Sequence, residues 1–421
     1  MRAVFVVVHR FVGLTIAAFL FISGLTGAVI SWDHELDELI NPHLVNAPGR
    51  GAFLDPLVLA DKLAADEPHS FVTYVPLHPE AGHSLPFGVE PRFNAETQDL
   101  YETGYNQVFI DPVTGDVRGK REWGAAWPIT TETFVSFMYV LHYSLHIPEM
   151  WGIDRWGEWL MGGVALLWTI DCFVGFYLTL PIRKRTTARI GAWWSRWKPA
   201  WKIKATGSAY RINFDLHRAF SLWTWVLLFV LAVSAVSLNL YFEVARPIVS
   251  ALSSFTPTPF DTRPMLPHSG MLAPKVTYAQ VLANGRAEAA RRGFTLPAGD
   301  IFYSPDFGVF GVRFFNPGDE HGDGIKLGND VLYFDSEDGR YIGDWIPWRG
   351  TAGDLFLQMQ FPVHSGRIFG IPGRILISAM GLGVAMLSVT GVVIWLRKRR
   401  ARRAVRRPAT VTQQRNMVSA E

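Results

Sequence analysis

Four stretches of the chain are almost entirely apolar, and each is long enough to cross a membrane. A helix needs about 20 apolar residues to span a hydrocarbon core of about 30 Å. The first stretch begins like a signal peptide, but its apolar run is too long for one and no small-residue cleavage site follows, so we expect an uncleaved anchor. The predicted membrane helices span residues 1–32, 158–182, 219–242 and 374–396.

The basic residues predict the orientation of these helices. Residues 183–211 are rich in Lys and Arg and contain no acidic residue, and residues 397–403 are again basic. Such segments stay in the cytoplasm, so we expect both termini there and a multi-pass protein of a bacterial inner membrane. The predicted cytoplasmic segments are residues 183–218 and 397–421, and the predicted periplasmic regions are residues 33–157 and 243–373.

The order of short motifs indicates a tandem duplication. A His-Arg pair opens the first and third helices, an Asp-x-x-x-Gly-x-x-x-Gly motif closes each periplasmic region, and a His-x5-Gly-Ile motif precedes the second and fourth helices. Recurrence of several motifs in one order is the signature of a repeat. Both halves cross in the same sense, which predicts two helix pairs related by an axis along the membrane normal. The matched motifs begin at His9 and His217, at Asp111 and Asp335, and at His146 and His364.

Each periplasmic region shows a helix-like stretch followed by strand-like runs and turns. This order predicts a small α+β domain, with an antiparallel sheet covered by one helix. The fold class expected is therefore a four-helix membrane protein with two periplasmic α+β domains. The helix-like stretches are 57–65 and 278–292, and the strand-like runs are 71–75, 85–89, 107–110, 308–315 and 331–334.

Five histidines at the ends of the predicted membrane helices are the candidate site residues. His9 and His217 lie near the cytoplasmic side, whereas His364 lies near the periplasmic side together with His142 or His146. Paired imidazoles on neighbouring helices, with apolar walls, are what axial ligation of a b-type haem needs. We therefore expect two haems, one near each membrane face.

The residue patterns leave the fourth ligand open. His142 and His146 are one helical turn apart, and the repeat alignment favours His146, while the other histidine could hydrogen-bond a propionate or bind the iron. A lone histidine at a helix end is more often a hydrogen-bonded interfacial residue. Recurrence at equivalent depth in both halves favours ligation, because ionisable groups at membrane depth tend to be functional.

Other chemistries have weaker support. Cys172 is the single cysteine, so no disulfide, thiolate metal site or covalent haem attachment is available within the chain. Asp171 lies inside a predicted membrane helix and is either a proton relay or, more simply, a paired or protonated carboxyl. Nucleotide-binding glycine loops are missing, and the segregated charge implies anionic lipid rather than nucleic acid as a partner.

The motifs together resemble the PepSY-associated transmembrane family, which includes iron-regulated membrane proteins and ferric-siderophore reductases. The match covers nearly the whole chain except the basic tail. It rests on residues 9–14 (HRFVGL), 141–148 (LHYSLHIP), 215–218 (DLHR) and 364–374 (HSGRIFGIPGR).

The resemblance implies PepSY-like periplasmic domains and four helices that bind two haems. It also implies electron transfer from the cytoplasmic side to a periplasmic acceptor, a ferric siderophore or another ferric chelate. Larger relatives append a flavin reductase module. None is expected here, so a quinol or a cytoplasmic reductase would serve as a separate electron donor.

Two other classes of function remain possible from the sequence. A non-enzymatic membrane anchor could bind or regulate a periplasmic partner, and it would not need the histidine pairs. A small-molecule or metal transporter could also be built from parallel repeats, but it would need discontinuous helices and polar groups at mid-membrane. Apart from Asp171, the predicted membrane helices contain few such groups.

The charge pattern makes a testable prediction about topology. Reporter fusions at Gly49 and Gly324 should be active only with periplasmic enzymes, and a fusion at Arg196 only with cytoplasmic ones, because basic segments resist translocation. Alkaline phosphatase and a fluorescent protein serve as the paired reporters. A fusion at Gly49 that is active only in the cytoplasm would overturn the orientation.

Overall fold

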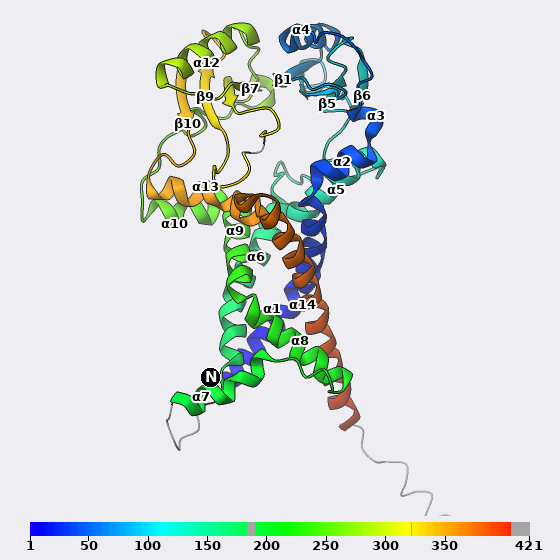
Figure 1. The fold of residues 1–421 in the computed structure, drawn as a ribbon, viewed down its shortest axis with the longest axis vertical. Coiled ribbons are helices and arrows are strands. Elements are labelled where there is room, and N and C mark those ends of the chain that lie inside the picture. Colours follow the sequence, from blue (N-terminus) through cyan, green and yellow to red (C-terminus); the bar gives the residue numbers. More distant parts are fainter. Residues whose placement is uncertain (183–189, 321, 406–421) are drawn as a thin grey trace, which may run out of the picture. The chain divides into compact units, whose positions relative to one another are not determined.

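The computed structural model describes residues 1–182, 190–320 and 322–405 (Figure 1). The basic run 183–185, His321 and the tail beyond Val405 lie outside the described residues. The chain divides into two compact units, each assembled from segments that are distant in sequence. Unit 1 comprises Met1–Leu25, Leu160–Ala235 and Ala379–Glu421, and unit 2 comprises Thr26–Trp159 and Val236–Ser378.

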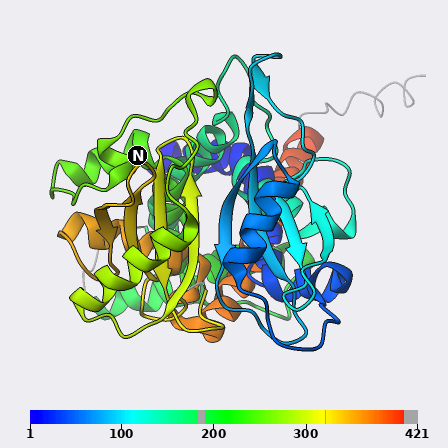
Figure 2. The ribbon, with the colours of Figure 1, turned by 90° about the horizontal axis from the view of Figure 1, so that it is seen from above.

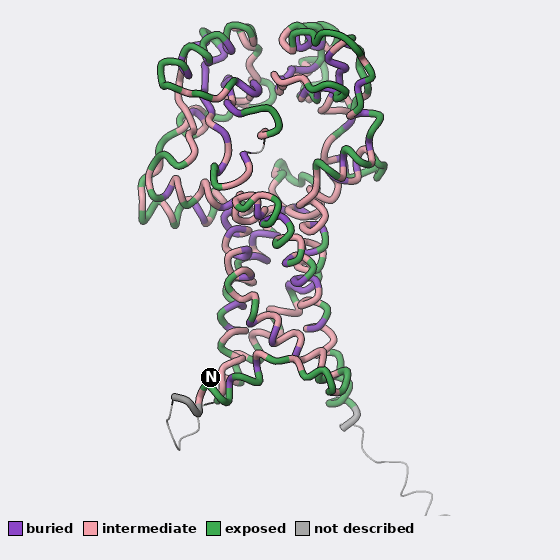
Figure 3. Tube along the Cα trace, viewed as in Figure 1, coloured by how far each residue is buried: buried purple, intermediate pink, exposed green. Residues whose placement is uncertain are grey.

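Three helices in the described part of the chain are long and apolar enough to cross a membrane: α1 (Arg2–Ile30), α6 (Trp156–Thr179) and α14 (Gly370–Val405). They coincide with three of the four predicted spans. Only 6% of the most apolar window of α1 is buried within the protein, so nearly all of its side chains there remain at least partly exposed (Figure 3). An apolar surface of this kind needs lipid around it.

The span expected at residues 219–242 is not one straight helix. It is divided between α8 (Ala209–Trp223) and α9 (Trp225–Asn239), which meet at a bend of 71°, so the spans number four only if this pair counts as one. Thr224 leaves the helical conformation, and its hydroxyl donates to the Phe220 carbonyl at 2.8 Å. Such a back-bond competes with the backbone ladder and favours bending.

Shorter helices connect and cover these elements. In unit 1, α7 and η1 precede α8. In unit 2, the other short helices lie before, between and after the strands described below. The short helices of both units are α2 (Asp33–Ile40), α3 (Pro42–Val45), α4 (Pro56–Asp66), α5 (Thr131–Ser144), α7 (Ile190–Trp197), η1 (Lys198–Trp201), η2 (Tyr241–Ala245), α10 (Arg246–Ser250), α11 (Pro259–Thr262), η3 (His268–Gly270), α12 (Tyr278–Arg292), α13 (Ala352–Ser365) and η4 (Arg367–Phe369).

Unit 2 contains one antiparallel sheet of eight strands in the order β10-β9-β8-β7-β1-β2-β5-β6. Each of the two regions predicted to be periplasmic contributes a meander of four strands, preceded by a helix, α4 or α12, that covers the sheet (Figure 2). A separate two-stranded ribbon pairs β3 with β4. The strands are β1 (Ser70–Pro76), β2 (Leu85–Pro91), β3 (Phe93–Asn94), β4 (Asp99–Leu100), β5 (Gln107–Ile110), β6 (Val117–Arg121), β7 (Ala298–Ser304), β8 (Val309–Phe314), β9 (Asp330–Asp335) and β10 (Tyr341–Trp345).

The two periplasmic regions are joined edge to edge by their first strands. β1 pairs with β7 in antiparallel register, with Tyr74 opposite Phe302. The Tyr74 hydroxyl also donates to Asp300 at 3.1 Å, and Arg313 holds the same carboxylate. Pairing the two edges removes a row of unsatisfied backbone groups that an isolated meander would expose. The two expected α+β regions therefore share a sheet.

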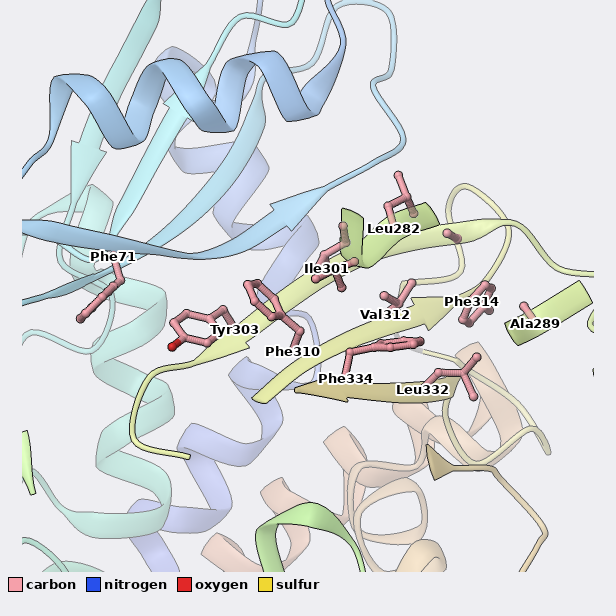
Figure 4. Close-up of a cluster of buried hydrophobic side chains, with 12 residues drawn as sticks. Phe71, Leu282, Ala289, Ile301, Tyr303, Phe310, Val312, Phe314, Leu332 and Phe334 are labelled. Atoms are coloured by element: carbon pink, nitrogen blue, oxygen red, sulfur yellow. The ribbon is translucent and has the colours of Figure 1, made fainter. Parts of the chain in front are cut away.

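Each region nevertheless keeps its own hydrophobic core. One core lies under α4, with Leu59, Val75 and Phe87 almost completely buried. The other lies under α12 and includes Phe310 and Phe334. Figure 4 shows the second core and the Phe71 ring that reaches it from β1, so the cores touch across the shared sheet.

The duplication also appears in two helices that follow the meanders. α5 and α13 each contain 14 residues and begin with a capping box, at Thr130 and at Thr351. A capping box satisfies backbone N–H groups that the first turn leaves without partners. His142 lies near the end of α5 and His364 near the end of α13.

The Asp-x-x-x-Gly motif forms the hairpin turn at the end of each meander. The Asp111 carboxylate accepts hydrogen bonds from the amides of Val113 and Gly49, both at 2.9 Å, while Gly115 adopts a φ of +74°. Burial alone would raise the pKa of Asp111, but the amides of Val113, Gly49 and Thr114 outweigh burial and lower it. The motif is therefore structural.

We predict that Asp111→Asn lowers the free energy of unfolding of unit 2 by about 1–3 kcal/mol, because buried amides lose a charged acceptor. Since the folded-state pKa is lowered, this stabilisation is full above the unfolded pKa of about 4 and is lost as the pH falls through the folded value. Thermal unfolding of the detergent-solubilised protein measures both effects.

Asp116→Asn, at an exposed position of the same turn, is the matched control and should behave like the wild type. Equal unfolding of the Asp111→Asn variant and the wild type at pH 7 would contradict the assigned role of the carboxylate.

Candidate functional site

Two pairs of histidines form the candidate site, one pair in each unit. In unit 1, His9 on α1 and His217 on α8 have ring centroids 6.3 Å apart and ring planes at 57°. In unit 2, His142 on α5 and His364 on α13 have ring centroids 6.1 Å apart and planes at 67°. Two separate pairs thus have nearly the same spacing.

The Nδ1 atoms of the unit 1 pair are held by acceptors. The His9 Nδ1 lies 2.9 Å from both carboxylate oxygens of the buried Asp171. The His217 Nδ1 lies 3.1 Å from the Leu387 carbonyl and 3.0 Å from the Thr390 hydroxyl. Because an ionised carboxylate and a carbonyl only accept, each Nδ1 is the protonated nitrogen and each Nε2 keeps a lone pair. That tautomer can bind a metal.

Glycines stand against both rings of this pair. A Cβ on Gly175 would lie 3.5 Å from His9 Cε1, and a Cβ on Gly391 would lie 3.2 Å from His217 Cε1. Gly13, one helical turn beyond His9, has no heavy atom within 4 Å of its would-be Cβ. The glycines therefore let α6 and α14 approach the imidazoles and leave open space beside His9.

That space belongs to a cavity of about 500 Å³ within unit 1. Its walls are largely apolar and include Trp168, Phe176 and Trp225, and the two imidazoles line it. A volume of this order is typical of small-molecule and cofactor sites. The cationic side chains of its lining are Arg2, Arg10, Arg218, Lys398 and Arg402.

The unit 2 pair repeats this construction. The His142 Nδ1 lies 3.1 Å from the hydroxyl of the buried Thr26. A Cβ on Gly27 would lie 2.9 Å from His142 Cε1, which is closer than side chains approach. An imidazole is again packed against a glycine of the neighbouring helix, with its Nδ1 held by a polar side chain.

The structure gives the two candidates for the fourth position different neighbours. His146 follows α5 with a φ of +52°, and its Nε2 lies 2.9 Å from the Phe137 carbonyl. Its ring stacks on Phe137 with centroids 4.6 Å apart. The ring next to His364 is that of His142, whereas the repeat alignment favoured His146. The alignment differs from the observed pairing because the connections after α5 and α13 differ, although both helices carry a histidine in their last turn.

Asp171 also has a clear partner. The sequence left open a proton relay or a paired or protonated carboxyl, and in the structure the carboxyl pairs with His9. Thr390, Thr26 and the three glycines beside the rings were not anticipated. Thr390 gives no sequence signal, since a threonine inside an apolar helix commonly bonds its own backbone, as Thr390 also does to Met386.

No group of three or more His, Cys, Asp or Glu side chains in the described residues could hold a bare metal ion. The two histidine pairs each supply two imidazole nitrogens as possible ligands.

The fold and the site define a helical membrane protein with an antiparallel sheet unit and two pairs of adjacent histidines. The family model for the PepSY-associated TM region matches residues 6–398. The chain therefore belongs to this family, as its motifs predicted. A comparison with curated proteins found no match.

Proposed function

We propose that this protein is an inner-membrane di-haem oxidoreductase that passes electrons from the cytoplasmic side to a periplasmic ferric chelate. A ferric siderophore is the simplest acceptor, and its reduction would release Fe(II). The observation that carries the proposal is the spacing of the histidine pairs, with ring centroids 6.3 Å and 6.1 Å apart.

This spacing fits two imidazoles that share one iron. An imidazole nitrogen lies about 2 Å from a bound metal and about 1.1 Å from its own ring centre, so two imidazoles on opposite sides of one iron would have centroids about 6.2 Å apart. Edge-to-face contact between rings gives a similar spacing, as Tyr139 and Tyr143 show at 6.1 Å, so the assignment also needs the surroundings of the rings. Both pairs match the ligand spacing, although they are built from different helices.

The surroundings of the rings support the same assignment. Metal-binding histidines almost always donate their second N–H to a carboxylate, carbonyl or similar group, which fixes the tautomer and the ring orientation. His9 has Asp171 in this role, and His217 has the Leu387 carbonyl. Gly13 leaves open space where a side chain would fill the cavity, and arginines line the same cavity where propionates need cations.

The residues would divide the work as follows. His9 and His217 would hold the iron of one haem, and His142 and His364 that of the other. When bound, a b-type haem supplies an iron that carries one electron. Asp171, Thr390 and Thr26 would orient the ligand rings, and the apolar walls of the cavity would exclude water.

A ferric chelate suits such a protein because its release needs only one electron. Siderophore oxygens are hard ligands and hold Fe(III) far better than Fe(II). No nucleophile or general base is then required. The electrons would come from a quinol or from a cytoplasmic reductase, and the acceptor would meet the protein through unit 2.

We predict that the purified protein contains two b-type haems with the sharp visible bands of six-coordinate low-spin iron. His217→Ala and His364→Ala should each remove about half of the haem, because each deletes one axial ligand of one site. His142→Ala should behave like His364→Ala, whereas His146→Ala should keep both haems. Pyridine haemochrome assays and visible spectra measure haem content.

Full haem content in a variant lacking His9, His142, His217 and His364 would overturn the ligand assignment. A haem-free wild type would instead favour the membrane-anchor or transporter functions. If ferric siderophores left the reduced protein unchanged while a quinone or Cu(II) oxidised it rapidly, the siderophore acceptor would be wrong.

We predict further that Asp171→Asn raises the midpoint potential of one haem only. A carboxylate at the Nδ1 proton makes the imidazole a stronger donor and favours Fe(III), so its removal favours Fe(II). A tenfold change in the relative stability of the two iron states corresponds to about 59 mV. Redox titration followed by visible spectra measures the shift.

The haem held by His142 and His364 is the internal control for this titration, because its potential should stay unchanged. A shift of both potentials together, or of neither, would contradict the role given to Asp171.

A further inference from the structure

Unit 2 contains a second cavity, of about 590 Å³, beside the helix that carries His364. It lies within the second periplasmic region. Its walls come from η2, α10, α11, the β8–β9 connection, β10, α13 and η4. Its volume is in the range of small-molecule sites and far below what a protein partner would fill.

The cavity approaches His364 along one face of α13. Leu357 and Phe361 line it and are followed at helical spacing by His364, so the three side chains form one stripe. Arg367, just beyond the helix, lines the cavity as well. Whatever occupies the cavity therefore lies next to the helix face that presents His364.

Aromatic rings dominate the apolar part of the wall. Trp345 on β10 packs closely against Gly328, where a Cβ would lie 3.0 Å from the indole. Arg246 already stands over the Phe255 ring at 5.7 Å. Aromatic faces and guanidinium groups bind planar aromatic anions well. The aromatic residues of the lining are Tyr241, Phe242, Phe255, Phe260, Trp345 and Phe361.

The carboxylates of the lining are already engaged. Asp261 pairs with Arg246 at 2.6 Å, and Asp344 pairs with Arg292 at 2.6 Å. Asp354 accepts from the Thr351 amide at the start of α13 at 2.8 Å.

The guanidinium groups of the lining differ in whether they form ion pairs. Arg367 pairs with both Asp33 and Asp323. Arg349 is exposed, lines the cavity and makes no ion pair within the described part of the chain. The cavity therefore offers beside its aromatic wall one guanidinium that makes no ion pair in the described residues, although its charge also acts on Asp330.

We propose that this cavity binds the electron acceptor, and that the acceptor is an anionic ferric chelate with aromatic oxygen donors of the catecholate or phenolate class. Three catecholates around Fe(III) leave a net negative charge for Arg349, and their rings match the aromatic wall. This inference rests on the proposed function. In that reaction one electron from the quinol or cytoplasmic reductase converts Fe(III) to Fe(II), no covalent bond breaks, and the oxygens take up protons from water as the iron leaves.

Gallium(III) separates binding from reduction, because it has the charge and size of Fe(III) but is not reduced. We expect the full-length protein in nanodiscs to bind the gallium complex of a hexadentate tris-catechol chelator by calorimetry. Arg349→Gln should weaken binding at least tenfold, since a charge-assisted contact is lost. Arg349→Lys should recover part of the affinity. Haem content and both midpoint potentials should stay unchanged.

Arg286→Gln is the matched control, because Arg286 is an exposed arginine of α12 in the same unit and does not line the cavity. It should bind like the wild type. Equal binding of the gallium tris-catecholate by the wild type and Arg349→Gln would overturn the inference. It would also fall if a gallium tris-hydroxamate bound as tightly as the tris-catecholate and did so without Arg349. Arg349-dependent binding of a short-chain quinone in place of the chelate would assign the cavity to another ligand.

The two proposals fail differently. If the protein reduces the ferric tris-catecholate but shows no Arg349-dependent binding of the gallium complex, this inference falls and the proposed reaction stands. If the gallium complex binds through Arg349 but the ferric complex is not reduced, the binding site stands and the proposed reaction falls.

Discussion

The hydrogen bonds at the Nδ1 atoms of His9 and His217 fix the candidate site of unit 1. An imidazole inside an apolar cavity cannot leave its N–H without an acceptor, because an unsatisfied buried donor costs about 1–3 kcal/mol. Asp171 and the Leu387 carbonyl supply the acceptors, and they come from α6 and α14. Holding the two rings therefore ties α1 to α6 and α8 to α14, with glycines at the points of closest approach.

In unit 2 the comparable constraint is the pairing of β1 with β7. Each meander alone would have an open edge, and their union gives one sheet that supports two cores. The sheet leads on both sides into a capped helix, α5 or α13, whose last turn carries a histidine of the pair. The duplication is thus visible in the meanders, in the capped helices and in the histidines that these helices carry.

The halves are not equivalent in every respect. In the second region, aromatic rings and arginines line the 590 Å³ cavity beside α13. A repeated scaffold can keep its symmetric parts for one role and use one half for another, since loops vary more freely than the elements they connect. Under the proposed function, the stripe from Leu357 to His364 would link cofactor binding and acceptor recognition on one helix.

The sequence alone determined the features that depend on local composition or short-range order: three of the membrane helices, the duplication, the α+β regions, the family, and the histidines as candidates. Apolar length and motif order carry this information without any long-range contact. The bend at Thr224 involves a local hydrogen bond but is visible only in the structure. Tertiary structure decided the sharing of one sheet and placed the ring of His142, rather than that of His146, beside His364. It also brought Asp171 to His9, and Thr390 to His217. These contacts join residues far apart in the chain, and neither spacing nor periodicity encodes which side chains meet when helices pack.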